Sequence, residues 1–352
     1  MTTGKKIALG VLAVLGAAIL YLCLWPVPID PAAWTPPQAP QTHDNGRLRG
    51  VKKLATSVRG PEATVVGPDG KLYAGTSDGK AMRIDLERGT AETFADTAGR
   101  PLGMKFDAHG ALIVADARKG LLSIDPRGRV SVLAKEHAGA PLRFVDDLAI
   151  ASDGRIYFSD ASTRFGYGEH LFDVLEHRPN GRVFVYDPST KTLSIVMRDL
   201  YFPNGVALSP DGAFLVVNET WKYRVLRHWL TGPQAGKTEA WIENLPGLPD
   251  NITAAPNGGY WVALFTPRNH ELDSMLPRPF LRKLSLRLPA AIRPKAAHHA
   301  YVLKLDAEGK IALDLQDASP DAYAPITSVT EHAGKLYLGS LEADGIGVIA
   351  AP

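Results

Sequence analysis

The nine residues SDGRIYFSD, at positions 152–160, contain the pattern that decides the fold of this chain. A polar turn centred on Gly154 leads into an apolar, aromatic-rich run, and the short apolar stretch DLAIA (147–151) precedes the turn. Strand, glycine turn and strand in this order predict a β-hairpin. The pattern recurs five times, as PDGKLYAGT (68–76), AHGALIVAD (108–116), PDGAFLVVN (210–218), PNGGYWVAL (256–264) and HAGKLYLGS (332–340).

The spacing of these copies predicts the architecture. Successive turn glycines lie 40, 44, 58, 46 and 76 residues apart, and most copies are followed by a third strand. A period of about 40–50 residues with about four strands is typical of propeller blades. No copy has a 3.6-residue apolar period, which excludes a helical solenoid. We therefore predict an all-β fold, a six-bladed β-propeller over residues 50–352, with insertions at 161–181 and 266–300 that carry function or cover a site.

The composition excludes several classes of protein. Of 352 residues, 33 are Gly and 27 Pro, 22% are charged, and the net charge is +2. These values exclude a disordered chain, a collagen, a coiled coil and a nucleic-acid binder with a strongly basic surface. The single cysteine, Cys23, excludes a disulfide scaffold. The sequence also has neither a Gly-x-Ser-x-Gly elbow nor a phosphate-binding loop.

The N-terminus predicts a membrane anchor. Residues 7–25 form an uncharged apolar run of 19 residues, which as a helix spans about 28 Å, the hydrocarbon thickness of a bilayer. Lys5 and Lys6 precede the run, and the next basic residue is Arg47. The positive-inside rule predicts a single-pass protein with a cytoplasmic N-terminus and an extracytoplasmic propeller, periplasmic in a bacterium. The alternative is a cleaved signal peptide, whose apolar core is normally shorter.

The first fifty residues thus divide into two parts. Residues 1–25 are expected to form the cytoplasmic tip and the transmembrane anchor. Residues 26–49 follow as a stalk, and the six prolines between positions 26 and 40 favour a stiff, extended chain.

The repeat alignment also predicts a site. The residue eight positions before each turn glycine is expected at the entry of the innermost strand, where equivalent positions of all blades converge on the central axis. These six residues are Glu62, Leu102, Asp146, Asn204, Asp250 and Ile326. Four of them carry oxygen ligands, and three of those four are carboxylates. The alternative is that they are ordinary solvated turn residues, since Asp and Asn are common at strand entries.

Three carboxylates buried together indicate a bound cation, because their mutual burial is costly without one. Oxygen ligands without His or Cys favour calcium, with magnesium or another divalent cation as second choice. The next repeat position adds Asp147 and Asn251 as further or supporting ligands. The predicted metal site therefore comprises Glu62, Asp146, Asn204, Asp250 and Asn251.

Several linked motifs resemble one protein family. They are GPEA (60–63), GRPLGM (99–104), FVDDLAIASDG (144–154), FPNGVALSPDG (202–212), NETWKYRV (218–225) and LPGLPDNITAAPNGGYWVAL (245–264). Together they are similar to the strictosidine synthase-like and adipocyte plasma membrane-associated protein family of six-bladed propellers, within a wider group that includes gluconolactonase and paraoxonase. The resemblance covers the propeller, the basic insertion and the N-terminal anchor.

The resemblance has implications for the site. It implies that Glu62, Asn204 and Asp250 are metal ligands, that Asp146 takes the place of an Asn ligand, and that Asn251 follows the ligand Asp. It also places Thr327 where strictosidine synthase has its catalytic Glu, so strictosidine-type condensation is not expected. The catalytic His of paraoxonase falls at Leu102 and is missing too.

Two functions remain open at this point. The first is a membrane-anchored, calcium-dependent hydrolase of lactones or aryl esters, in which a carboxylate beside the metal activates water or attacks the ester. Its catalytic candidates are Asp250, by resemblance, and Asp147, by position. The second is a non-catalytic, calcium-stabilised propeller that binds a partner or a small ligand.

The insertions supply weaker candidates. His170 and His177 could overhang the channel mouth as acid–base groups, as could His298 and His299, although histidines in loops are commonly just solvated. Residues 278–295 contain six basic and no acidic residues, with Leu281, Leu284 and Leu288 at helical spacing. Such a segment either lies on an anionic membrane surface or packs as a lid over the channel, and the two interpretations are compatible.

Overall fold

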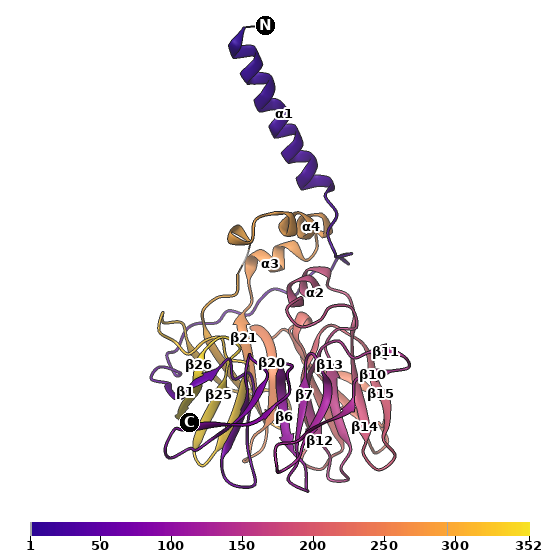
Figure 1. Ribbon diagram of the computed structural model, residues 1–352, viewed down its shortest axis with the longest axis vertical. Coiled ribbons are helices and arrows are strands. Elements are labelled where there is room, and N and C mark those ends of the chain that lie inside the picture. The colour runs from indigo at the N-terminus through magenta and orange to yellow at the C-terminus, as the bar shows by residue number, and fades with distance from the viewer. Residues whose placement is uncertain (1, 294) are drawn as a thin grey trace.

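Six four-stranded antiparallel sheets surround a central axis in the computed structural model, which describes residues 2–293 and 295–352 (Figure 1). The first five sheets are consecutive in the chain. Their strands are β2 (Thr64–Val66), β3 (Leu72–Gly75), β4 (Lys80–Ile84) and β5 (Ala91–Asp96); β6 (Pro101–Phe106), β7 (Leu112–Asp116), β8 (Gly120–Ile124) and β9 (Val130–Ala134); β12 (Val145–Ile150), β13 (Ile156–Asp160), β14 (Gly181–Asp187) and β15 (Thr192–Leu200); β16 (Pro203–Leu208), β17 (Phe214–Glu219), β18 (Arg224–Trp229) and β19 (Thr238–Ile242); and β20 (Gly247–Ala254), β21 (Tyr260–Pro267), β22 (Ala300–Leu305) and β23 (Ile311–Asp317). The predicted six-bladed propeller is confirmed.

The sixth blade joins the two ends of the propeller. Its strands are β24 (Ser328–His332), β25 (Lys335–Gly339), β26 (Asp344–Ala350) and, from the other end of the domain, β1 (Lys52–Arg59). Strand β1 pairs antiparallel with β26, with Leu54 opposite Ile346. This pairing closes the ring, so the blades are held to a common axis by hydrogen bonds as well as by packing.

The turn glycines have the conformation that the hairpins require. All six, Gly70, Gly110, Gly154, Gly212, Gly258 and Gly334, have φ between 69° and 87°. This left-handed region is open to glycine and strained for most other residues. The apolar faces of neighbouring blades then pack on each other, as Ile113 and Leu121 do against Val145 and Phe158.

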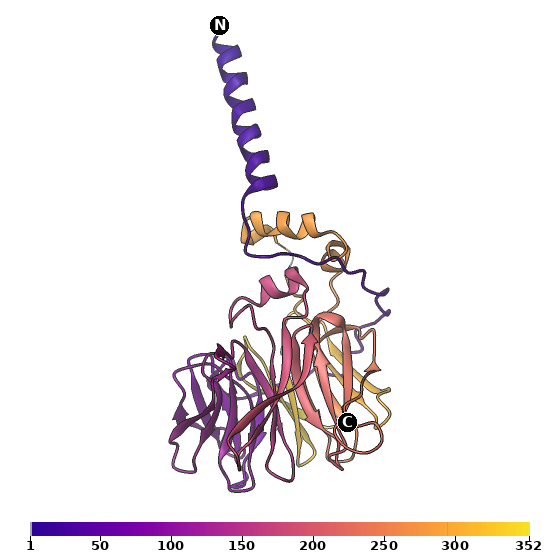
Figure 2. The same cartoon turned by 90° about the vertical axis from the view of Figure 1, so that its right-hand side faces the viewer.

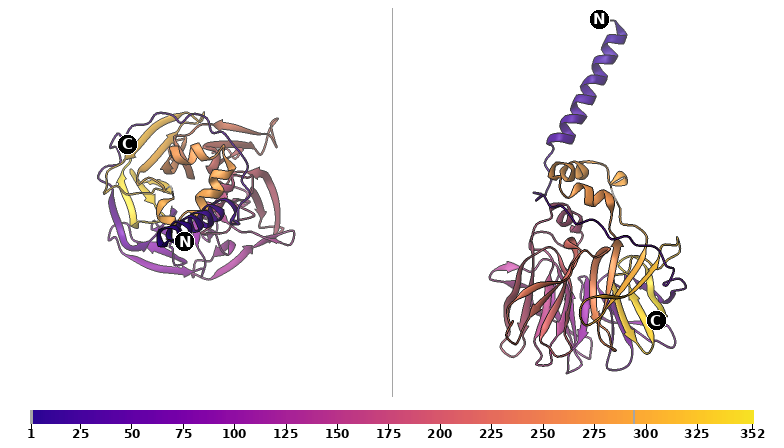
Figure 3. Two further views of the ribbon diagram at one scale, coloured as in Figure 1. Left: turned by 90° about the horizontal axis from the view of Figure 1, so that it is seen from above. Right: turned by 180° about the vertical axis from the view of Figure 1, so that it is seen from behind.

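Helices from the two insertions lie together over one end of the ring (Figures 1 and 3). The first insertion forms α2 (His170–Glu176), and the second forms α3 (His270–Met275), α4 (Pro279–Arg287) and the short 3-10 helix η2 (Ala290–Ile292). We call α2, α3 and α4 the lid. A 3-10 turn, η1 (Thr220–Lys222), and a small hairpin of β10 (Glu136–His137) and β11 (Ala140–Pro141) complete the described elements.

Helix α1 (Thr3–Leu24) is long and apolar enough to cross a membrane, and none of its residues is buried. It projects away from the ring on the lid side (Figure 2). Its C-terminal end meets the lid at Arg287, whose guanidinium donates to the carbonyls of Trp25 (2.7 Å) and Leu22 (2.9 Å). A cation at this position satisfies carbonyls that have no partner within the helix and interacts favourably with the helix dipole.

The proline-rich segment after α1 is extended, as expected, but it is not a free spacer. Residues 26–38, which we call the strap, run between α2 and α4 (Figure 2). The backbone N–H of Ala32 donates to the Glu176 carbonyl, and that of Trp34 donates to the Leu276 carbonyl. Ile29 is buried in the same apolar cluster as Leu175. The strap therefore connects the anchor helix to the lid.

Candidate metal-dependent active site

The predicted ring of polar residues lines one small cavity on the axis, beneath the lid. This axial chamber has a volume of about 100 Å³, and its wall includes Glu62, Asp146, Asn204 and Asp250 as well as Leu102. All four polar residues are buried, with exposed fractions between 2% and 6%. Ile326, the sixth aligned position, is fully buried but is not part of this wall. The repeat count thus selected residues that the fold brings together.

Asp147 and Asn251, the two residues at the next repeat position, have different surroundings. Asn251 donates from Nδ2 to Oε1 of Glu62 at 2.6 Å, so it supports a wall residue directly. Asp147 instead accepts the backbone N–H of Val206 in the next blade at 3.0 Å, and it is not part of the chamber wall. Its carboxylate helps to hold two inner strands together and does not face the cavity.

A second layer of side chains fixes the backbone beneath the chamber. Ser159 donates to the Asn204 carbonyl at 2.7 Å, Asn218 to the Asp250 carbonyl at 2.6 Å, and Thr327 to the Glu62 carbonyl at 2.6 Å. Each hydrogen bond runs from one blade to the next. Sequence reasoning missed Ser159 and Asn218, which lie five and six residues after their turn glycines and so share no repeat position. Thr327 holds the backbone where the resemblance expected an acid–base residue.

The electrostatics of the chamber are dominated by crowded acids. Burial, followed by the charge of Asp250, raises the pKa of Glu62 well above its ordinary value. Burial, followed by the charge of Glu62, does the same for the pKa of Asp146. Burial raises the pKa of Asp250 to about 8, although a hydrogen bond from Asn204 opposes the shift. Each of these carboxyl groups therefore resists ionisation while the others are charged.

A buried arginine acts on these acids. Arg100 is fully buried, and its charge lowers the pKa of both Glu62 and Asp146. Its guanidinium is held by the Gly60 carbonyl at 3.0 Å and by the Tyr167 hydroxyl at 3.1 Å. One positive charge cannot balance three carboxylates, so ionisation of the ring favours an additional cation.

Unpartnered oxygens in this region fit such a cation. Among the residues described, Oε2 of Glu62 and Oδ1 of both Asn204 and Asn251 are buried and accept no hydrogen bond. Buried polar atoms without partners are rare, and a hard cation satisfies oxygens of this kind. Within the described part of the chain, no three His, Cys, Asp or Glu side chains are already gathered at metal-holding geometry. The fit to a divalent cation is instead one of donor chemistry, since the unpartnered atoms are all oxygens and Asn204 adds an amide ligand to the carboxylates.

Of the four candidate histidines, one lines the axial chamber. His170, the first residue of α2, lines the axial chamber. Desolvation by the surrounding protein lowers the pKa of its imidazole. His177 is buried under the strap, stacked on Trp34 with ring centroids 4.6 Å apart. His298 and His299 line neither the chamber nor the cavity above it.

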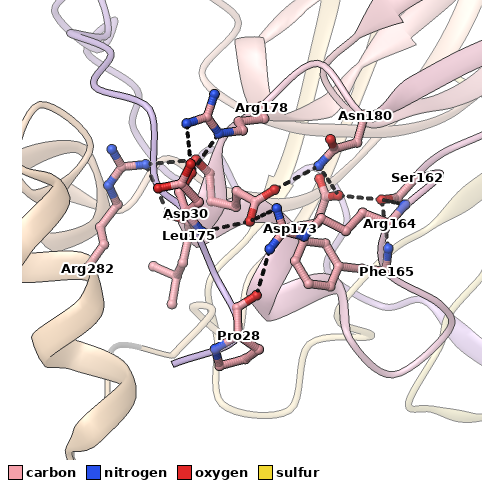
Figure 4. Close-up of polar contacts among 11 residues, drawn as sticks. Pro28, Asp30, Ser162, Arg164, Phe165, Asp173, Leu175, Arg178, Asn180 and Arg282 are labelled. Carbon is pink, nitrogen blue, oxygen red and sulfur yellow. Dashed lines mark hydrogen bonds and ion pairs between the residues drawn. The ribbon is translucent and has the colours of Figure 1, made fainter. Parts of the chain in front are cut away.

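The basic insertion forms a lid helix, and two of its arginines point inward. Arg282 is fully buried and donates to the carbonyls of Leu175 and Ala32 (Figure 4). Arg287 is 8% exposed and binds the end of α1. Apolar side chains of α4 point outward instead: Phe280 is 53% exposed, and Leu281 and Leu284 are partly exposed. These two charges are thus used within the protein. Arg278 and Lys295 are exposed and Lys283 is partly exposed, so contact of the insertion with lipid headgroups stays a prediction.

These features define the class of protein: a six-bladed propeller with an acidic axial chamber under a helical lid. Comparison with known proteins then gives the family. The strictosidine synthase family matches residues 146–233, and the strictosidine synthase-like N-terminal family matches residues 43–84. The chain is 33% identical to adipocyte plasma membrane-associated protein from Mus musculus over 345 residues, covering 90% of this chain and 82% of the relative. It belongs to the strictosidine synthase-like family.

A plant relative and a solved structure extend the comparison. Protein STRICTOSIDINE SYNTHASE-LIKE 10 from Arabidopsis thaliana is 35% identical over 362 residues, covering 94% of this chain and 96% of the relative. A gluconolactonase from Xanthomonas campestris superimposes with a TM-score of 0.63 at 18% identity, covering 93% of this chain and 99% of that chain. At this identity the likeness shows the propeller fold alone.

Proposed function

We propose that this protein is a membrane-anchored, calcium-dependent hydrolase of lactones or aryl esters. The observation that carries the proposal is the axial chamber, in which three buried carboxyl groups and an amide oxygen without a partner surround a small cavity. The gluconolactonase and the calcium-binding protein regucalcin among the structural neighbours support the choice of reaction and metal. Helix α1 and the plasma membrane-associated relative support the anchor.

Glu62, Asp146, Asn204 and Asp250 would hold the cation, with Asn251 supporting Glu62. Calcium bound there would polarise the carbonyl of the substrate and stabilise the negative charge that develops on its oxygen. Asp250, as a carboxylate, accepts the proton of the attacking water and returns it to the departing alcohol oxygen. Asp147 is the weaker of the two catalytic candidates, because its carboxylate is engaged by Val206 between blades.

The first test replaces a wall carboxylate by its isosteric amide. Glu62→Gln removes one ligand charge, and calcium affinity depends on that charge, so we expect affinity to fall about a hundredfold. Hydrolysis of lactones and aryl esters should fall with it. Isothermal titration with calcium and a substrate screen with and without chelator measure the two effects on the full chain.

Asp153→Asn is the matched control, because Asp153 lies on a hairpin turn of the propeller and its side chain is half exposed. It should leave calcium affinity and turnover unchanged. Full esterase activity after thorough chelation would contradict the proposal. Calcium binding without turnover of any substrate in the screen would favour a calcium-stabilised binding propeller instead.

A further inference from the structure

A second cavity lies above the axial chamber, and its wall is largely apolar. We call it the lid cavity; its volume is about 250 Å³. The lid contributes Leu171 and Val174 from α2 and Leu272 and Met275 from α3, and the propeller rim contributes Tyr223. Among the residues described, no carboxylate lines it, although the wall includes the amide of Asn269 and the cationic side chains of Arg293 and Lys295. A cavity of this composition suits a hydrocarbon group better than a charged one.

The lid cavity adjoins the axial chamber. Four residues belong to the walls of both: His170, Trp221, Leu248 and Phe265. A single molecule can therefore place one end among the acids and extend its other end into apolar surroundings without leaving the protein.

A further cavity lies between the lid and the anchor helix. This third cavity, the α1–α4 cleft, has a volume of about 520 Å³. Its wall includes Tyr21 and Leu22 of α1 and Leu286, Arg287 and Leu288 at the end of α4. Arg293 lines both this cleft and the lid cavity. Its guanidinium is held by the carbonyls of Leu286 and Leu288, at 2.8 and 2.9 Å. The cleft thus shares a wall residue with the lid cavity, and the lid cavity shares wall residues with the chamber.

Helix α4 also presents apolar side chains to the outside. Phe280 is exposed and Leu281 and Leu284 are partly exposed, whereas Arg282 is fully buried. The guanidinium of Arg287, in the cleft wall, is engaged by the carbonyls at the end of α1. With α1 leaving the lid at the same place (Figure 2), a bilayer that receives α1 would also meet this face of α4.

We propose that the substrate is an ester or lactone with a long unbranched hydrocarbon tail, taken from the bilayer through the α1–α4 cleft. The carbonyl enters first and reaches the acids of the axial chamber, while the tail trails through the lid cavity towards the membrane. This inference rests on the proposed hydrolase function and adds the substrate class and the direction of entry.

The test uses the full chain in phosphatidylcholine vesicles with a series of p-nitrophenyl esters from acetyl to decanoyl. Each methylene buried in the lid cavity should raise kcat/KM about two- to fourfold until the cavity is full. Leu272→Trp fills the cavity and should lower the decanoyl-to-acetyl ratio of kcat/KM at least tenfold. Met275→Trp, on the same wall, gives a second variant if the first does not fold. Val132→Trp, at an exposed site on β9, is the control and should leave the ratio unchanged.

The outcomes separate the two proposals. Metal-dependent hydrolysis with no dependence on chain length overturns the tail site and leaves the hydrolase function standing. If no ester is hydrolysed, binding of the methyl ester of a dansyl-labelled undecanoic acid still tests the tail site. The cavity variants should then weaken binding at least tenfold relative to Val132→Trp, and equal affinities would overturn the inference. Equal rates for decanoyl ester presented in vesicles and in detergent micelles would overturn entry from the bilayer.

Discussion

Three carboxyl groups in one buried chamber determine the chemistry at the scale of single residues. Glu62, Asp146 and Asp250 are each less acidic than an ordinary carboxyl group, because burial and mutual repulsion oppose ionisation. A bound cation would favour the ionised carboxylates, because its positive charge compensates their negative charges. Binding of the metal and loss of protons should therefore be coupled.

This coupling predicts how the metal-free protein responds to pH. The folded-state pKa of Asp250, about 8, lies above its value in the unfolded chain. At pH values between the two pKa values, the folded state binds more protons than the unfolded state. The stability that Asp250 contributes is therefore lost as pH rises towards 8. In chelator, the melting temperature of the wild type should fall by roughly 5 °C more than that of Asp250→Asn between pH 5.5 and 8.

The wild type must be compared with Asp250→Asn because a second buried group, His177, changes stability with pH in the opposite direction to Asp250. Burial, followed by the charge of Lys222, lowers the pKa of His177 to about 3, so the stability it contributes is lost as pH falls below about 6.5. Differential scanning fluorimetry measures both proteins, and calcium at pH 8 should restore the wild type. If the two proteins responded equally to pH, the acid chamber would not be the cause.

At the scale of elements, the lid is held by polar groups buried between α2, α4 and the strap (Figure 4). Glu176 is fully buried, accepts the N–H of Asp30 at 2.9 Å and pairs with Arg164 at 3.0 Å. Arg282 joins all three elements through the carbonyls of Leu175 and Ala32. Buried charge-assisted hydrogen bonds are costly to break, because the remaining partners stay unsatisfied.

Arg282→Met should therefore loosen the lid. The variant keeps an apolar stem but leaves the carbonyls of Leu175 and Ala32 without their donor. We expect amide hydrogen exchange in α2 and α4 to accelerate at least tenfold, measured by mass spectrometry, with the blades unchanged. Lys283→Met is the control, because Lys283 is the adjacent residue and none of the hydrogen bonds described involves its side chain. Equal exchange in both variants would show that Arg282 does not clamp the lid.

For the whole molecule, the anchor, the strap and the lid form one connected unit above the propeller (Figure 2). The strap is tied at several points along its length. Trp34 stacks on His177, Asp30 pairs with Arg178 at 2.7 Å, and the Pro37 carbonyl accepts from Arg268 at 2.6 Å. The stability of the lid in a soluble fragment should therefore depend on whether the fragment still includes the strap.

Two truncations test this connection. A fragment that begins at residue 25 keeps the strap, whereas one that begins at residue 45 loses the strap together with every contact that it makes with the lid and the propeller. We expect the shorter fragment to be cleaved at least tenfold faster within residues 266–300 by a protease, while the longer fragment resembles the intact chain. Identical cleavage rates of the two fragments would show that the strap does not support the lid.

The blades and the acid ring could be predicted from the sequence, because both depend on local or repeated patterns. Gly154 and its equivalents favour hairpin turns through their own backbone freedom, and alternating apolar residues favour strands. Since a propeller places equivalent positions around one axis, the repeat count also located Glu62, Asp146, Asn204 and Asp250. The calcium, the ester substrate and the membrane topology stay predictions.

Only the tertiary structure decided what covers the chamber. The strap contacts Glu176 and Leu276, more than a hundred residues away in the sequence, and no repeat or periodicity marks such a contact. The pattern of α4 predicted a helix, yet it did not show which face would be buried, because the segment carries both basic and apolar residues and the arginines, not Phe280, turned inward. Arg282 and Arg287 point inward because backbone carbonyls of the strap and of α1 require donors there. Local preferences thus determined the blades, and long-range hydrogen bonding determined the lid.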